Sequence, residues 1–215
     1  MSSSTSSNAN RRPVREDADD SRLRPDGYKP AIAPNALKVV HRRPQPSKER
    51  EISMQMHVEI VEKPEMKAVV LRTLQSSRDV RQAWAEIERY MATSGTIADR
   101  DHGLVFIPEW QWSTWVETLW VGVEVDSFDE VPERFETLTI PARAFAKLAV
   151  YGNRQAMDAT YDYLWDWFKQ DGRERDVSEG SFGYEANRLA PINPFHVPAD
   201  VIDHFDFDIY APLKR

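Results

Sequence analysis

The chain has 215 residues, a formal net charge of −7, 41% hydrophobic residues and no cysteine. This length allows one substantial domain and a tail, and no stretch approaches the roughly 18 consecutive apolar residues of a membrane span. The lack of cysteine excludes disulfides and thiolate chemistry and fits a reducing compartment. Since no signal-peptide pattern is present either, we expect a cytoplasmic protein.

Residues 1–50 differ in composition from the rest of the chain. They contain six of the 14 prolines and neither tryptophan nor phenylalanine, so they cannot bury enough apolar surface to offset the entropy of ordering. Their charge is +5, against −12 for residues 51–215. A basic arm can contact nucleic acid, but the acidic run at 16–20 interrupts this one and favours a solvated linker. The sequence predicts a disordered tail at 1–50 and one folded domain at 51–215.

The predicted elements of the folded part follow each other as two similar series. In chain order we expect strands at 57–61 and 67–74, a helix at 77–93, strands at 104–108, 118–125, 135–140 and 144–151, a helix at 153–170, and strands at 182–189 and 205–213. The proline-rich insertion 190–199 has no counterpart in the first series and is expected to form a loop over one end of the molecule. The fold class is α+β with mainly antiparallel sheet.

The two series are related by an offset of 77 residues. Four apolar residues in each predicted helix share the spacings 4, 3 and 4, which makes one apolar helix face. The two sets are Val80, Trp84, Ile87 and Met91, and Met157, Tyr161, Leu164 and Phe168. Pro64 and Pro141, upstream of the helices, have the same offset. The sequence therefore predicts a duplicated strand-helix-strand-strand unit with a seam between the copies.

Strand alternation assigns candidate ligand contacts. In 118–125, Trp120, Gly122 and Glu124 share the face opposite the four hydrophobic residues, a pattern typical of a strand that lines a cavity. In the last strand, alternation turns Tyr210 away from the apolar face and into the seam. The other aromatic candidates are Trp110 and Trp112, which alternate onto one face, and Phe106 and Tyr184; core packing remains the alternative for the tryptophans.

Four segments together resemble the GyrI-like small-molecule-binding domains, also called AraC-type effector-binding domains. These segments are 120–125, 135–147, 182–185 and 208–214. The resemblance spans about residues 55–214 and implies two units related by pseudo-two-fold symmetry, with an aromatic ligand groove between the halves. It also implies that Glu185 is a buried acid facing the ligand and that Tyr210 lines the same pocket.

The chemistry of such a groove favours cations. A carboxylate among aromatic rings pays a desolvation cost, which a cationic ligand relieves by charge pairing and cation–π contact. If the alignment slips at the insertion, Glu124 or Glu117 becomes the better acid. The insertion could also cap the groove, with Phe195 and His196 reaching the ligand.

Two functions remain open. The first is a stand-alone effector- or drug-binding domain for planar hydrophobic or cationic molecules. The alternative is a hydrolase that opens cyclopropane-containing electrophiles, with Glu185 as the catalytic residue that handles water. We expect no metal, since the histidines lack ligand spacing, and no cofactor. The expected partner is a small molecule, with a separate regulator protein as a further candidate; membrane binding, or nucleic-acid binding by the folded domain, is not expected.

Overall fold

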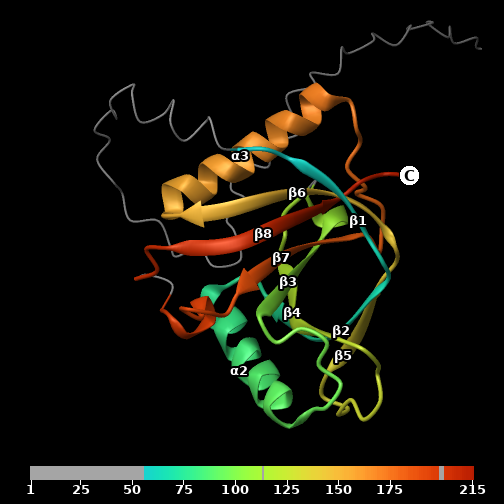
Figure 1. The fold of residues 1–215 in the computed structure, drawn as a ribbon, viewed down its shortest axis with the longest axis vertical. Helices are drawn as coiled ribbons and strands as arrows, with labels where there is room; N and C mark the ends of the chain where they lie inside the picture. Colours follow the sequence, from blue (N-terminus) through green and yellow to red (C-terminus); the bar gives the residue numbers. More distant parts are fainter. Residues whose placement is uncertain (1–55, 113, 199–200) are drawn as a thin grey trace, which may run out of the picture.

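The computed structural model describes residues 56–112, 114–198 and 201–215, so the tail expected at 1–50 lies outside the described residues. In chain order the elements, including two single 3-10 turns (η), are β1 (Glu59–Lys63), β2 (Met66–Leu74), α2 (Ser77–Thr93), β3 (His102–Pro108), η2 (Glu109–Gln111), β4 (Thr118–Val125), β5 (Glu136–Ile140), β6 (Arg143–Gly152), α3 (Arg154–Asp171), β7 (Phe182–Arg188), η3 (Pro194–His196) and β8 (Phe205–Pro212) (Figure 1). None of the helices described here is long and apolar enough to cross a membrane.

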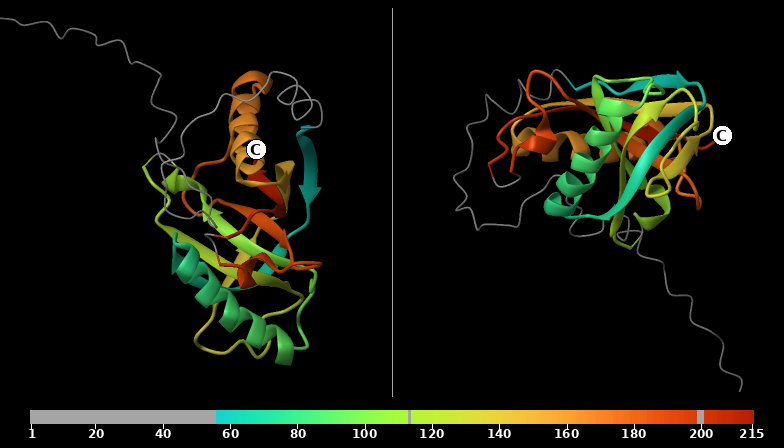
Figure 2. Two further views of the ribbon diagram at one scale, coloured as in Figure 1. Left: turned by 90° about the vertical axis from the view of Figure 1, so that its left-hand side faces the viewer. Right: turned by 90° about the horizontal axis from the view of Figure 1, so that it is seen from below.

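The strands form one sheet in the order β1-β6-β8-β7-β3-β4-β2-β5, with every neighbouring pair antiparallel. The predicted α+β class is therefore confirmed. The order is symmetric about the β7–β3 pair: β6 takes the place of β2, β8 that of β4, and β1 that of β5. Figure 2 shows the helices at opposite ends of the molecule, with α3 in the upper part and α2 in the lower part of its left-hand view.

The 77-residue offset relates four features of the two halves. It joins the first residues of β2 and β6, of α2 and α3, and of β1 and β5, as well as the two N-cap residues Ser76 and Asn153. Both caps accept a hydrogen bond from a first-turn amide, at 3.1 Å in α2 and 3.0 Å in α3. At the other end of α3, Gly172 adopts the left-handed conformation with φ 83°, which ends the helix. The repeat is thus maintained from caps to strands.

The outermost strands are exchanged between the halves. β1 precedes β2 in the chain but pairs with β6, with Lys63 opposite Arg143, whereas β5 precedes β6 but pairs with β2. The connections β1–β2 and β5–β6 run in opposite directions along the same side of the molecule (Figure 1). Each half therefore completes its part of the sheet with a strand from the other.

The sheet has two different faces. The helix face carries α2 and α3 and the larger hydrophobic core, whereas the outer face carries a second, aromatic cluster. In β4 the valines and Leu119 lie in the helix-face core and Trp120 lies on the outer face, as the alternation predicts. Packing explains the glycine at position 122, because a Cβ there would lie 2.2 Å from the carbonyl oxygen of Val69. Gly122 therefore permits close strand pairing and does not leave space for a ligand.

Candidate functional site

The two halves meet at β3 and β7, and we call the helix face of this strand pair the central seam. Val105 and Glu185 are opposite each other at the midpoint of the seven paired positions. α3 packs on β6 and α2 packs on β2 and β4, so each helix covers its own half. Large side chains from the helices and loops fill the seam between them, and these side chains decide what it can bind.

Glu185 is fully buried in the centre of the seam. The hydroxyl of Tyr161, on α3, donates a short hydrogen bond to its Oε1, whereas Oε2 accepts no hydrogen bond of normal geometry from any described residue. Burial raises the pKa of Glu185 to about 7, opposed by hydrogen bonds from Tyr161 and Asn187. Glu185 is thus poised to lose its proton near neutral pH when a positive charge arrives.

One end of the seam is closed by two stacked rings. Trp84 of α2 and Phe195 of η3 stack at a centroid distance of 4.4 Å. Both rings pack on Gly103, where an added Cβ would lie 2.6 Å from the Phe195 ring, and Gly103 pairs with Asn187. The insertion therefore does cover one end of the molecule, as predicted, and Phe195 is the residue by which it does so.

The other end of the seam contains a buried ion pair between aromatic rings. The Glu109 carboxylate lies over Gly183, where a Cβ would be 2.1 Å from Oε1, and contacts the guanidinium of Arg175. That guanidinium lies 4.2 Å from the ring centroid of Trp112 and 4.4 Å from that of Trp165. Burial raises the pKa of Glu109, while the charge of Arg175 lowers it. This end therefore resembles an aromatic cage filled by a cation of the chain itself.

A small cavity connects this cage with the centre of the seam. Its volume is about 10 Å³, at the lower limit of what one water molecule needs. Trp112, Trp165, Arg175 and Glu109 line it, together with Tyr161, the hydrogen-bond donor to Glu185. The seam is therefore closed in this conformation, and a ligand has to displace side chains in order to enter.

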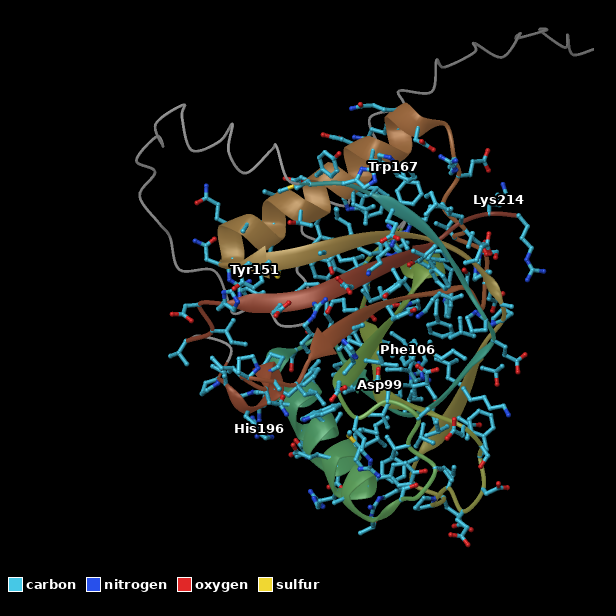
Figure 3. All side chains as sticks on the ribbon, viewed as in Figure 1. Asp99, Phe106, Tyr151, Trp167, His196 and Lys214 are labelled. Atoms are coloured by element: carbon cyan, nitrogen blue, oxygen red, sulfur yellow. The ribbon has the colours of Figure 1, made fainter. Side chains whose placement is uncertain are left out.

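The outer face gathers most of the predicted aromatic contacts. Tyr184 and Tyr210 stack at 4.4 Å with an interplanar angle of 10°, and Tyr184 also contacts Phe106 at 5.8 Å. Trp110 and Trp120 both pack edge-on against Phe182, at 5.0 and 5.1 Å. Phe106, a member of this cluster, is labelled near the middle of the molecule in Figure 3. Phe106, Tyr184 and Tyr210 are buried, so these rings mainly contact one another.

Cations of the chain already occupy the outer face. The ammonium of Lys63 lies 5.4 Å and that of Lys147 5.9 Å from the ring centroid of Tyr210. The guanidinium of Arg72 lies 5.3 Å from that of Trp120. Lys147 is also paired with Asp208 at 3.5 Å, so a cationic ligand on this face would have to compete with these side chains for the faces of the rings.

The structure separates residues that the sequence analysis placed in one groove. Glu185 and Tyr210 lie on opposite faces, because the register pairs Tyr184 with Tyr210 and Glu185 with Ile209, and neighbouring residues of a strand alternate. Trp112 lies on the helix face and Trp110 on the outer face, because Glu109–Gln111 form a 3-10 turn and not an extended strand. The expectation of one shared groove is corrected accordingly.

The alternative acids lie away from the seam. Glu124 is half-buried on the outer face with its pKa raised by burial, and Glu117 is exposed before β4. His196 binds Glu88 of α2 at 2.9 Å and is placed beside that helix in Figure 3. Of the acids weighed from the sequence, Glu185 is the one inside the seam.

Sequence reasoning missed Tyr161, Glu109 and Arg175. Tyr161 was counted only as part of an apolar helix face, although its hydroxyl needs a partner when buried. Glu109 and Arg175 come from connections without periodicity. A signal for the first was present in Gly183, since a glycine within a strand indicates close approach of another group.

Comparison with known proteins agrees with the fold described above. The profile of the family described as GyrI-like small molecule binding domain matches residues 56–187. No curated protein gives a significant sequence match to the chain. Among solved structures, the C-terminal domain of EcmrR superposes with a TM-score of 0.59 at 14% identity, over 75% of this chain and 99% of that one.

Two further structures are similar at lower scores. EcmrR in its complex with DNA matches with a TM-score of 0.55 at 15% identity, over 79% of this chain, which spans 61% of that one. SAV2435 bound to tetraphenylphosphonium matches with a TM-score of 0.48 at 11% identity, over 74% of this chain and 94% of that one. The two EcmrR structures support the fold assignment alone.

Proposed function

The chain belongs to the family of GyrI-like small-molecule-binding domains, and on that premise we propose that it binds a planar organic cation in the central seam, with Glu185 accepting the ligand's charge. The observation that supports this most strongly is the carboxyl group of Glu185, which is fully buried with Oε2 lacking a normal hydrogen bond from the described residues. A buried carboxyl oxygen without a normal hydrogen bond costs stability, which favours a ligand as the partner of Oε2.

Charge also favours the seam over the outer face. On the outer face, Lys63 and Lys147 already lie over Tyr210, so an incoming cation has to compete with them for this ring. In the seam it meets a carboxyl group that ionises on binding and the rings of tyrosine and tryptophan. A neutral planar molecule would gain only the apolar contacts, so the proposed selectivity is for cations.

The pH dependence of binding follows from the pKa of about 7 in the free protein. A bound cation stabilises the carboxylate and lowers that pKa, so below pH 7 the ligand must displace a proton. The affinity for a cation should therefore rise about tenfold per pH unit up to pH 7 and level off above it. A neutral ligand should show no such slope.

Calorimetric titration of the full chain with 10-methylacridinium, and with neutral phenazine as its uncharged counterpart, tests the proposal. We expect Glu185→Gln to weaken the cation by about 10- to 100-fold, in line with the roughly 1.5–3 kcal/mol of a hydrogen bond to a charged group, and to leave phenazine unchanged. Glu117→Gln, an exposed change of the same kind, is the control. Equal affinity of the cation for wild type and a folded Glu185→Gln protein would refute the assignment.

A hydrolase remains the second candidate, favoured by one observation. A carboxyl group with a pKa near 7 beside a tyrosine hydroxyl has the properties of a general base that activates water. Mass spectrometry of a cyclopropane-containing electrophile incubated with the protein distinguishes the two functions. Recovery of the intact compound indicates binding alone, whereas a product heavier by one water that disappears in Glu185→Gln indicates hydrolysis.

A further inference from the structure

The cage at one end of the seam has the parts of a cation-binding site. Trp112 and Trp165 form two walls whose ring centroids are 4.9 Å apart at an angle of 73°. Glu109 supplies a fully buried carboxylate, and Gly183 leaves the room that this carboxylate occupies. Rings and a carboxylate around one point are the arrangement that proteins use for guanidinium and ammonium groups.

The present occupant of this cage is a side chain that can leave it. The backbone around Arg175 is fixed to the end of the chain: Asp176 N donates to Pro212 O and Lys214 N to Glu174 O, each at 2.9 Å. Asp176 is also held by Arg143 at 2.6 Å. The side chain of Arg175 is 11% exposed, with its Nε buried. Because the backbone is anchored, the cage would be emptied by a change of rotamer of this side chain and not by movement of the segment.

The emptied cage would open toward the proposed ligand site. Arg175 lines the small cavity that Tyr161 also lines, and Tyr161 is the residue bound to Glu185. When the guanidinium leaves, this volume grows by the space of one planar cation. The enlarged cavity would then reach from Glu109, at its end, to the centre of the seam, where Glu185 borders it.

We propose that Trp112, Trp165 and Glu109 form a cation subsite whose resting occupant is Arg175, and that an organic cation of the amidinium or guanidinium class enters by displacing this side chain. The inference rests on the proposed function in that the subsite opens into the same seam. Arg175 thereby acts as an internal competitor: it keeps Glu109 paired while the site is empty and lowers the apparent affinity for every cation that uses the cage.

Binding of benzamidinium to the full-length protein and to Arg175→Ala, measured by calorimetry, tests this competition. Removal of the competitor should raise the affinity by about tenfold or more, because the fraction of molecules with an open cage increases. Benzamide, which has nearly the same shape without the charge, should gain nothing. Adding Glu109→Gln to Arg175→Ala should abolish the gain. Arg173→Ala, two residues away at an exposed ion pair, is the matched control and should bind as wild type does.

Several results would overturn the proposal. These are equal benzamidinium affinity of wild type and a folded Arg175→Ala protein, a gain shared by benzamide, a gain that survives Glu109→Gln, and no binding to either protein. If Arg175→Ala does not fold, Arg175→Lys takes its place, because the shorter side chain weakens the contact with Glu109. This variant should show a smaller gain in benzamidinium affinity, and no gain in it also refutes the proposal. The gain in Arg175→Ala should persist when Glu185→Gln is added, so failure of the Glu185 assignment is recognised separately.

Discussion

The two halves of the molecule share a frame but differ in chemistry. Trp84 and Tyr161 occupy equivalent positions on α2 and α3, 77 residues apart, and Val105 and Glu185 are opposite each other at the centre of the seam. In the first half the pair is apolar, and Trp84 stacks on Phe195. In the second half it is polar, and Tyr161 donates to Glu185. Duplication thus supplied the scaffold, while at the centre of the seam the second copy supplies the acid and the first copy packs.

The largest effect on stability is expected from the packed tryptophan of the first half. Trp84→Ala should lower the free energy of unfolding by about 3–5 kcal/mol, because a large ring with 1% exposure is lost and the Phe195 stack with it. Urea unfolding measures this change. The equivalent Tyr161→Phe should cost less, about 1–3 kcal/mol, since it leaves the buried Glu185 without this hydrogen bond but deletes no ring. Similar losses in both variants would contradict the division of roles between the halves.

The second prediction concerns the pH dependence of stability. The pKa of Glu185 is about 7 in the folded protein, above the ordinary 4.5 that we take for the unfolded chain. Between these values the folded state binds more protons, so stability should fall by about 3 kcal/mol as pH rises from about 4.5 to 7. Unfolding curves of wild type and Glu185→Gln across this pH window isolate the contribution of Glu185 to the free energy of unfolding. The same pH dependence in both proteins would contradict the prediction.

The smallest effect on stability is expected at the helix N-caps, a feature that the two halves share. Ser76→Ala and Asn153→Ala each remove an N-cap that accepts a first-turn amide hydrogen, and each should cost about 1 kcal/mol. Thermal unfolding should therefore rank the two variants together. A large difference would mean that the helices do not contribute equally to the common frame.

These contrasts also explain how much the sequence could predict. The duplication, both helices and the alternation in β4 follow from local periodicity, and the structure agrees with them. The association of Glu185 with Tyr161 instead depends on register and on the packing of α3, which no local pattern reports. The sequence analysis combined residues from both faces of the sheet because the resemblance named Glu185 and Tyr210 together, whereas the register of β7 and β8 places their side chains on opposite faces.

The cage was missed for a different reason. Glu109, Trp112 and Arg175 come from connections, whose conformation is set by tertiary contacts and not by periodicity. The tryptophan cluster was noticed, but a strand-like alternation was assumed where a 3-10 turn occurs. Long-range ion pairs of this kind become visible only when two loops are brought to the same end of the sheet.

The exchange of β1 and β5 also constrains how the protein can be synthesised. Lys63 pairs with Arg143, about 80 residues later, so β1 emerges from the ribosome without a partner. At roughly 5–20 residues per second, this strand waits several seconds for β6. During that time the free edge of β2 is likewise open until β5 appears. The edge of β3 also stays open until β7 is made. The nascent first half therefore exposes several unpaired strand edges, and chaperone protection matters most before the second half has been translated.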